Sequence, residues 1–317
     1  MAPYPLDAFE DAEGRLWLGS VGSGAFCWTQ LGLMEFHASD GLMGDRNMGF
    51  AAGPDGTLWF TSAEADMGGR SALVSWTEPG GFRLFPFPDS IPGAIEGVHF
   101  DAAGQIWLSG TAGIFQFDGA TFTRFDVPGD RKPMAYTPHR WFEASDGRIW
   151  FGTPDRGLWV WDGEAFTSFT TATGLLTDNA SVLCEDAEGQ IWISCFSWHL
   201  PDSIPPGGVC RWNGTQMETF PNTEGLHHND VYSGHCDRKG AVWLGATGHG
   251  VYRYDGHVFE RFDTMAEGEG QAEGLPFGLN SISEDRSGRL HFCFTGGLYH
   301  LTANGFAHYP RTRMVRP

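Results

Sequence analysis

The chain has 317 residues and a formal net charge of −19 at pH 7. So acidic a chain lacks the clustered Lys and Arg that bind phosphates, which argues against nucleic acid and anionic membrane surfaces as partners. No stretch reaches the roughly 18 apolar residues of a membrane span, so no membrane insertion is expected.

A short pattern occurs seven times along the chain, from DAEGRLWLG at residues 11–19 to DRSGRLHFC at residues 285–293. Each copy is a tight turn ending in glycine, followed by a strand with a large side chain three residues later. These anchors are Trp17, Trp59, Trp107, Trp150, Trp192, Trp243 and His291. They recur at intervals of roughly 40 to 50 residues, which is typical of four-stranded propeller blades.

The second half of each repeat is equally regular. A strand beginning near a glycine ends in Trp28, Trp76, Phe117, Trp161, Trp212, Tyr254 or, in the last copy, Leu301. Several copies then have Asp-Gly or Asn-Gly, a strong hairpin signal, and a fourth strand with two large apolar residues follows.

The sequence therefore predicts an all-β fold: a seven-bladed β-propeller of four-stranded antiparallel blades, each continuous in sequence. We expect a single domain over residues 1–317, with blades at approximately 4–38, 46–87, 94–127, 137–171, 179–222, 230–264 and 278–311. Because blade 7 has His291 in place of tryptophan, we expect the junction between blades 7 and 1 to open first.

The combined pattern resembles the two-component-regulator propeller repeat, found in sensor domains of bacterial hybrid histidine kinases and in stand-alone propellers. The resemblance covers about residues 5 to 310 and implies the fold more strongly than any activity. Blade 2, with GPDGTLWFT, also resembles the streptogramin lyase propellers. That resemblance implies an enzymatic alternative, but it matches only the scaffold part of the motif.

The N-terminal sequence MAPYPLDAFED has neither a basic segment nor an apolar one. No signal peptide is visible, so we expect a cytoplasmic protein if the chain is full length, and a periplasmic one if a leader has been removed. The six cysteines lie in predicted strands without zinc-ligand spacing. We expect small buried hydrophobic residues rather than a disulfide framework.

Candidate binding residues come from the positions at which the repeats differ. The loop entering each first strand and the connection from second to third strand share one face of a propeller, and such variable loops commonly bind ligands. The second-to-third connection is enlarged in blade 5, at Cys195–Gly208, and in blade 2, where it contains Glu64 and Arg70.

A register position eight residues before each turn glycine adds to this pattern. The residues there are Leu6, Met48, Glu96, His139, Ser181, Tyr232 and Asn280, which are apolar in blades 1 and 2 and polar in the other five. We therefore expect a ligand-binding cleft lined by Glu96, His139, Trp141, Asn179, Trp198, His199, His228, Asp230, Tyr232 and Asn280.

The leading interpretation is a non-enzymatic recognition or sensor propeller for a small molecule, glycan or peptide. The first alternative is a lyase or hydrolase that uses His and Glu residues at the same place. No cofactor is predicted, and the weaker alternative is a divalent metal held by His139, His227 and His228. The remaining alternative is a platform that binds a protein partner through its acidic rim.

Overall fold

The computed structural model describes residues 5–29, 32–64, 69–91, 93–128, 141–197, 207–222, 225–226, 230–246, 248, 250–265 and 278–309. Within these residues the chain forms β-strands and two short 3-10 helices, η1 (Ala38–Asp40) and η2 (Thr171–Thr173). No helix in this part of the chain is both long and apolar enough to cross a membrane.

The first four blades follow one another along the chain. Blade 1 consists of β1 (Pro5–Glu10), β2 (Leu16–Ser20), β3 (Ala25–Thr29) and β4 (Gly32–Phe36). Blade 2 consists of β5 (Arg46–Ala52), β6 (Leu58–Ala63), β7 (Ser71–Thr77) and β8 (Gly81–Pro86). Blade 3 consists of β9 (Ile95–Phe100), β10 (Ile106–Gly110), β11 (Gly113–Phe117) and β12 (Phe122–Phe125). Blade 4 consists of β13 (Trp141–Glu143), β14 (Ile149–Gly152), β15 (Leu158–Trp161) and β16 (Phe166–Phe169).

The last three blades repeat the same arrangement. Blade 5 consists of β17 (Ala180–Glu185), β18 (Ile191–Cys195), β19 (Gly208–Trp212) and β20 (Met217–Pro221). Blade 6 consists of β21 (Val231–Cys236), β22 (Val242–Ala246), β23 (Val251–Tyr254) and β24 (Phe259–Phe262). Blade 7 consists of β25 (Leu279–Glu284), β26 (Leu290–Phe294), β27 (Gly297–Thr302) and β28 (Gly305–His308).

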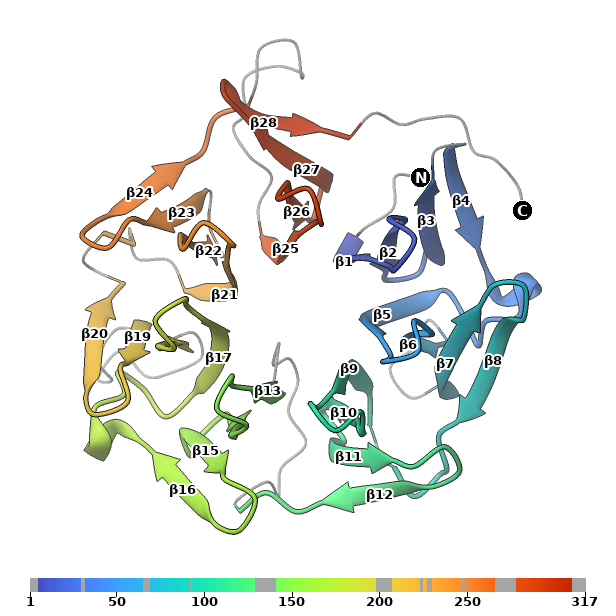
Figure 1. The fold of residues 1–317 in the computed structure, drawn as a ribbon, viewed down its shortest axis with the longest axis horizontal. Coiled ribbons are helices and arrows are strands. Elements are labelled where there is room, and N and C mark those ends of the chain that lie inside the picture. Colours follow the sequence, from blue (N-terminus) through green and yellow to red (C-terminus); the bar gives the residue numbers. More distant parts are fainter. Residues whose placement is uncertain are drawn as a thin grey trace. The chain divides into compact units, whose positions relative to one another are not determined.

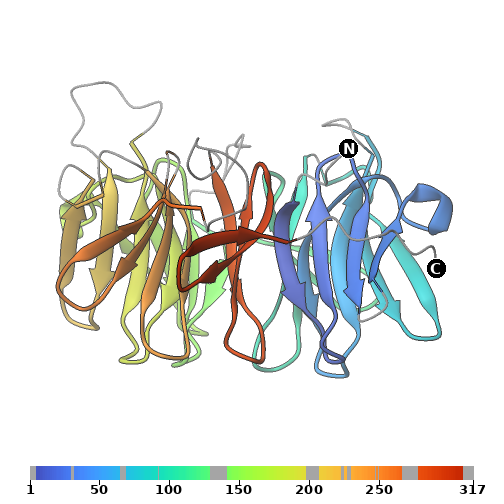
Figure 2. The ribbon, with the colours of Figure 1, turned by 90° about the horizontal axis from the view of Figure 1, so that it is seen from above.

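Each blade is a separate four-stranded sheet whose strands pair in chain order, as Figure 1 shows blade by blade. The pairs with a described register are antiparallel, for example Phe9 opposite Trp17 and Trp17 opposite Cys27. The first and fourth strands of a blade differ in direction, as Figure 2 shows, because twist accumulates across a sheet. The predicted fold class, a seven-bladed β-propeller with each blade continuous in sequence, is confirmed.

The chain divides into two compact units. The first comprises Met1–Phe125, Ser283–Leu301 and Ala307–Pro317, and the second comprises Asp126–Ile282 and Thr302–Phe306. In the first unit β5 contacts both β1 and β9, and β1 also contacts β26. In the second unit β17 contacts β13, β14 and β21. Neighbouring blades of a unit therefore pack through their first and second strands.

The predicted anchors all lie on the second strand of their blades. Trp17, Trp150 and Trp192 are completely buried, and Trp107, Trp243 and His291 are nearly so. Trp59 differs, because it is only partly buried, although it stacks on Phe85 with ring centroids 5.5 Å apart. Trp17 contacts Trp76 of blade 2, and Trp192 contacts Tyr254 of blade 6. These indoles therefore fill the space between consecutive blades.

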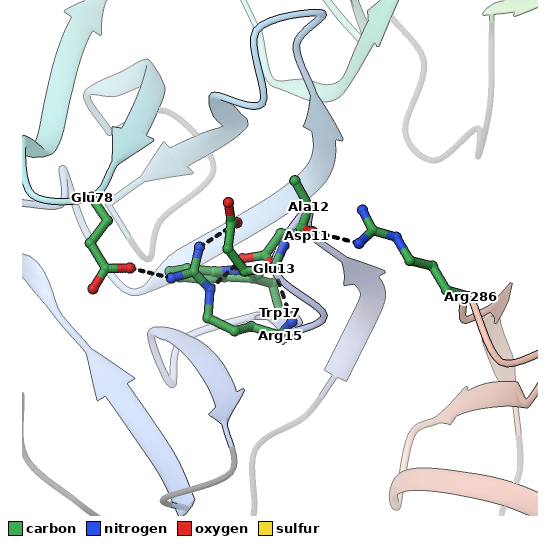
Figure 3. Close-up of polar contacts among 7 residues, drawn as sticks. All are labelled: Asp11, Ala12, Glu13, Arg15, Trp17, Glu78 and Arg286. Carbon is green, nitrogen blue, oxygen red and sulfur yellow. Dashed lines mark hydrogen bonds and ion pairs between the residues drawn. The ribbon is translucent and has the colours of Figure 1, made fainter.

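The turn aspartate fixes both the turn and the anchor. In blade 1, Asp11 Oδ1 accepts the backbone N–H groups of Glu13 and Arg15, and Oδ2 accepts the indole N–H of Trp17 at 2.8 Å (Figure 3). The side chain of Arg15 adds an ion pair to Asp11 at 2.6 Å and another to Glu78 at 2.5 Å. Because both carboxylate oxygens are engaged, the turn holds the indole at a fixed depth.

In several blades the residue two positions after the anchor is glycine, and the reason is steric. A Cβ atom at Gly19 would overlap the carbonyl oxygen of Asn47, and one at Gly152 would lie 2.7 Å from that of Ala180. Each clash is with the first strand of the next blade or its start. In blade 5 the position is Ser194, whose Oγ instead donates to the carbonyl of Val231 at 2.5 Å. Only small residues therefore fit where a first strand approaches the preceding blade.

Blade 7 joins blade 1 through the same kind of contact that joins blades inside a unit. The backbone N–H of Arg286 donates to Glu10. The Arg286 guanidinium donates to the carbonyl of Ala12 at 2.5 Å (Figure 3). The N–H of Ser145 likewise donates to Glu185, at equivalent positions of blades 4 and 5. The junction is thus closed at its turns by a hydrogen bond found elsewhere in the repeat.

Aromatic residues close the same junction farther out. His291 replaces the tryptophan anchor and hydrogen-bonds Asp285 at 3.1 Å through Nε2, while its Nδ1 lies 2.9 Å from the Tyr309 hydroxyl. Tyr309 in turn packs edge-on against Trp28 of blade 1, with ring centroids 5.4 Å apart. Burial lowers the pKa of His291, although Asp285 opposes the shift. A neutral imidazole can therefore make the bond that the indole N–H makes in other blades.

Candidate ligand-binding site

Among the first strands whose register is described, three carry a β-bulge at the position singled out in the sequence. Leu6, Glu96 and Tyr232 are each the extra residue between two neighbours that pair with the second strand. Met48 and Ser181 are instead paired in register, with Thr61 and Ser194. A bulge redirects its side chain, so the seven positions are not equivalent in the folded chain.

Glu96, in the first unit, is held by an ion pair. Its Oε1 accepts Arg46 Nη2 at 2.6 Å, and both side chains are mostly buried. Because Arg46 lies at the start of β5, the pair ties blade 2 to blade 3 near the beginnings of their first strands. Glu96 therefore has a structural partner in addition to any ligand.

A polar cluster lies at the join between blades 5 and 6, in the second unit. Asp230, 7% exposed, immediately precedes β21 and accepts the N–H and the hydroxyl of Ser197, the latter at 2.8 Å. Asn222, just after β20, also donates to Asp230, at 3.4 Å. Ser197, which lies 33 residues before Asp230, and Asn222, which lies 8 residues before it, thus both contact one carboxylate. We call Asn179, Phe196, Ser197, Asn222, Asp230 and Tyr232 the blade 5–6 cluster.

Tyr232 is the aromatic member of this cluster. It is partly exposed, and its ring lies 5.0 Å from that of Phe196, measured between centroids. Burial, and to a lesser extent the negative charge of Asp230, raise the pKa of the Tyr232 phenol. The hydroxyl is therefore fully protonated near neutral pH and can donate a hydrogen bond.

Asn179 joins the cluster through its backbone. Its carbonyl accepts the N–H of Phe196 at 2.8 Å and the hydroxyl of Thr177 at 3.1 Å. Within the part of the chain that the structure describes, the buried side-chain oxygen of Asn179 has no hydrogen-bond partner. This oxygen is thus a polar group for which the described residues supply no donor.

The remaining predicted residues lie in other strands or outside the described residues. Trp141 is buried in β13, with 6% of its surface exposed, and Asn280 is partly buried in β25. His139, Trp198, His199 and His228 lie outside the described residues, as does His227. All three proposed metal ligands are therefore among the residues not described. Within the described ranges, no three His, Cys, Asp or Glu side chains form a group that could hold a metal ion.

The cysteines correct one expectation. Cys184 of β17 and Cys236 of β21 form a disulfide, with Cα atoms 5.8 Å apart. The bond links the first strands of blades 5 and 6, which also carry or follow Asn179, Asp230 and Tyr232. The expectation that all cysteines are unpaired buried residues was therefore wrong for this pair. Cys27, Cys195, Cys210 and Cys293 are reduced thiols and are buried, as expected.

Sequence reasoning missed the residues that support the cluster. Phe196 and Ser197 belong to the enlarged connection of blade 5, in which the sequence singled out Trp198 and His199 instead. Asn222 gave a weak signal: it follows the last strand of blade 5, at the point where the chain leaves one blade for the next. Such a position is where an amide can bridge two blades.

Comparisons with known proteins agree on the fold. No protein-family model matches the chain, and no curated protein matches its sequence. Among solved structures, the extracellular domain of the putative hybrid two-component system BT3049 from B. thetaiotaomicron is similar, with a TM-score of 0.71 and 17% identity. That similarity covers 96% of this chain but only 40% of the other.

Two lyases are similar over nearly their whole length. A streptogramin B lyase has a TM-score of 0.69 at 14% identity, covering 94% of this chain and 92% of that one. Virginiamycin B lyase from Staphylococcus aureus has a TM-score of 0.62 at 15% identity, covering 93% and 92%. At such low identity these similarities show a shared propeller fold, and a fold hosts many activities.

Proposed function

We propose that this chain is a recognition propeller, and that it binds a small molecule, glycan or peptide at the blade 5–6 cluster. The observation that carries the proposal is that Ser197 and Asn222 both hydrogen-bond the buried Asp230, beside a partly exposed tyrosine on a bulge. Bulges commonly re-aim side chains at functional sites. A packing role alone would not require a polar cluster at this join.

The chemistry of the cluster suits a ligand with both polar and apolar parts. Tyr232 offers an aromatic face and a hydroxyl that stays protonated, while the buried Asp230 holds Ser197 and Asn222 in place beside it. Sugars, amines and peptides combine hydrogen-bond donors with apolar surface, which is the usual match for such a set. The disulfide between Cys184 and Cys236 limits the relative movement of the two strands that carry the cluster.

The protonation of Tyr232 and the hydrogen bonds of Asp230 favour recognition over catalysis. A phenol with a raised pKa is a poor general base near neutral pH, and the Asp230 carboxylate already accepts three hydrogen bonds. The structural neighbours include both a sensor domain and lyases, so they support either use of the fold. The sensor neighbour is consistent with binding without turnover.

Paired tyrosine variants test the proposal. A panel of oligosaccharides and short peptides is screened against the wild type by thermal shift, and the best binder is titrated by calorimetry. Tyr232→Phe removes one hydroxyl from the cluster and should weaken binding about tenfold, the effect of losing one hydrogen bond.

Tyr254→Phe is the matched control, because its hydroxyl donates to Gly256 at the opposite end of the same blade. Its affinity should equal that of the wild type. Equal affinities for wild type and Tyr232→Phe would place the site elsewhere. Chemical conversion of the bound compound, or of a streptogramin B substrate, detected by mass spectrometry would show an enzyme instead.

A further inference from the structure

Two free thiols face each other in the core of blade 5. Cys195 ends β18 and Cys210 lies in β19, and their sulfur atoms are 3.5 Å apart. Cys195 pairs with Gly208 and Cys210 with Ile193, so the two cysteines are diagonal neighbours on the same face of the sheet. Both side chains are completely buried, among the residues packed between blades 4 and 5.

We propose that Cys195 and Cys210 are a second disulfide site, which closes the base of the enlarged connection between β18 and β19. A disulfide needs sulfurs about 2.05 Å apart, so small side-chain rotations would bring these atoms into bonding distance. The alternative is that the pair are simply small buried hydrophobic residues. The proposal does not depend on the proposed ligand site.

The two thiols differ in acidity in the folded blade. Burial disfavours a thiolate at Cys195, but hydrogen bonds from the Cys210 thiol and the Thr177 and Leu176 backbones lower its pKa overall. Donating that hydrogen bond, together with burial, raises the pKa of Cys210. In the folded blade Cys195 is therefore the more acidic thiol of the pair.

The oxidant we name is a small disulfide such as glutathione disulfide, acting while the chain folds. The thiolate of one of the two cysteines attacks one glutathione sulfur, forms a mixed disulfide and releases one glutathione thiolate. The other cysteine then loses its proton and attacks the cysteine sulfur of the mixed disulfide, which releases the second glutathione. Two cysteine thiols are oxidised and one glutathione disulfide is reduced to two thiols. Complete burial restricts this exchange to the unfolded or partly open blade.

Oxidative refolding tests the proposal. The full chain is reduced and denatured, refolded in a glutathione redox buffer, denatured in an alkylating reagent, and mapped by mass spectrometry without reduction. We expect peptides that link Cys195 to Cys210 and Cys184 to Cys236. Cys27 and Cys293, which are also buried, should be alkylated as thiols. Recovery of alkylated Cys195 and Cys210 from chains with an intact Cys184–Cys236 bond would overturn the proposal, as would pairing with any other cysteine.

Two variants separate this bond from the established one. Cys184→Ser/Cys236→Ser should still form the Cys195–Cys210 link, and Cys210→Ser should leave Cys195 alkylated. The oxidised wild type should melt about 5 °C above the same protein carrying only the Cys184–Cys236 bond, as expected for closing a loop of about 15 residues. If refolding yields are too low, the map is made on protein secreted into an oxidising compartment. An unlinked pair there would equally contradict the proposal.

Discussion

At the scale of single residues, the turn aspartate does more than close a hairpin. Asp186 accepts the N–H groups of Glu188 and Gln190 through Oδ1, and the indole N–H of Trp192 at 2.8 Å through Oδ2. Blade 4 lacks this arrangement, because Ala144 occupies the aspartate position. Among the described residues, the buried indole nitrogen of Trp150 has no hydrogen-bond partner. Blades 5 and 4 thus show the same anchor with and without its aspartate acceptor.

Replacing Asp186 by alanine and Ala144 by aspartate should change the free energy of unfolding in opposite directions. Asp186→Ala should lower the free energy of unfolding by about 2 kcal/mol, because the substitution leaves a buried indole donor without a partner. Ala144→Asp should raise it by about 1 kcal/mol, since it supplies the acceptor that Trp150 lacks. Urea unfolding of both variants measures the two values. A loss of stability in both would show that the carboxylate acts through the turn alone.

The sequence predicts part of this arrangement. The spacing of turn glycine and anchor residue predicts which residue of each second strand is the anchor. The bond between the aspartate and the indole could not be predicted, because spacing shows where Asp186 and Trp192 lie along a hairpin but not how their side chains are directed. The partial burial of Trp59 was missed for the same reason.

At the scale of strands, one carboxylate supports a bulge in the neighbouring blade. β5 has a bulge at Gly49–Phe50, and the N–H of Phe50 donates to Asp7 of β1 at 3.2 Å. Burial raises the pKa of Asp7 to about 6, although hydrogen bonds from the Phe50, Ala8 and Gly49 backbones work against it. Asp7 thus links two blades, and the free energy of burying its side chain depends on whether the carboxyl is ionised.

The raised pKa of Asp7 has a definite consequence for stability. Folding favours the protonated form of Asp7. The stability that this group contributes is therefore fully present below pH about 4, and it is lost as pH rises to about 6. Asp7→Asn keeps an acceptor for Phe50 but cannot ionise. Relative to the wild type, the variant should gain stability between pH 4 and pH 6 and hold that gain at higher pH.

Urea unfolding of Asp7→Asn and wild type at pH 4, 5, 6 and 7.5 checks this. The test uses the difference in the free energy of unfolding between the two proteins, because other groups titrate in both. One of them is His291, whose lowered pKa destabilises the fold as pH falls below about 6.5. A difference that does not change with pH would mean that Asp7 ionises in the folded chain as it does in water.

Bulges also explain why the site was predicted only in outline. The sequence placed Glu96 and Tyr232 at a special position of their first strands, and both are bulged. In blade 5 the bulge falls instead at Leu183, which packs on Gly234 of the next first strand. An extra residue in a strand leaves no mark in the local pattern. The Cys184–Cys236 bond was missed because it depends on how two such strands align.

At the scale of the whole molecule, the repeat explains which features the sequence could predict. Seven copies of one hairpin pattern give seven independent readings of the same register, so an irregular copy such as blade 7 does not obscure the fold. The blade 5–6 cluster depends instead on contacts between particular residues of two blades, which the repeat pattern does not contain. Asp230 was recognised as a polar residue in a variable loop, whereas its partners Ser197 and Asn222 required the folded chain.

Hydrogen–deuterium exchange with and without a saturating ligand tests the central claim most directly. If the blade 5–6 cluster binds the ligand, backbone amides should gain protection in peptides covering residues 193–197 and 230–236. The turn peptides around Gly189 and Gly240, at the opposite ends of the same blades, should exchange as before. Protection confined to those turns, or to blades of the first unit, would contradict recognition at this cluster.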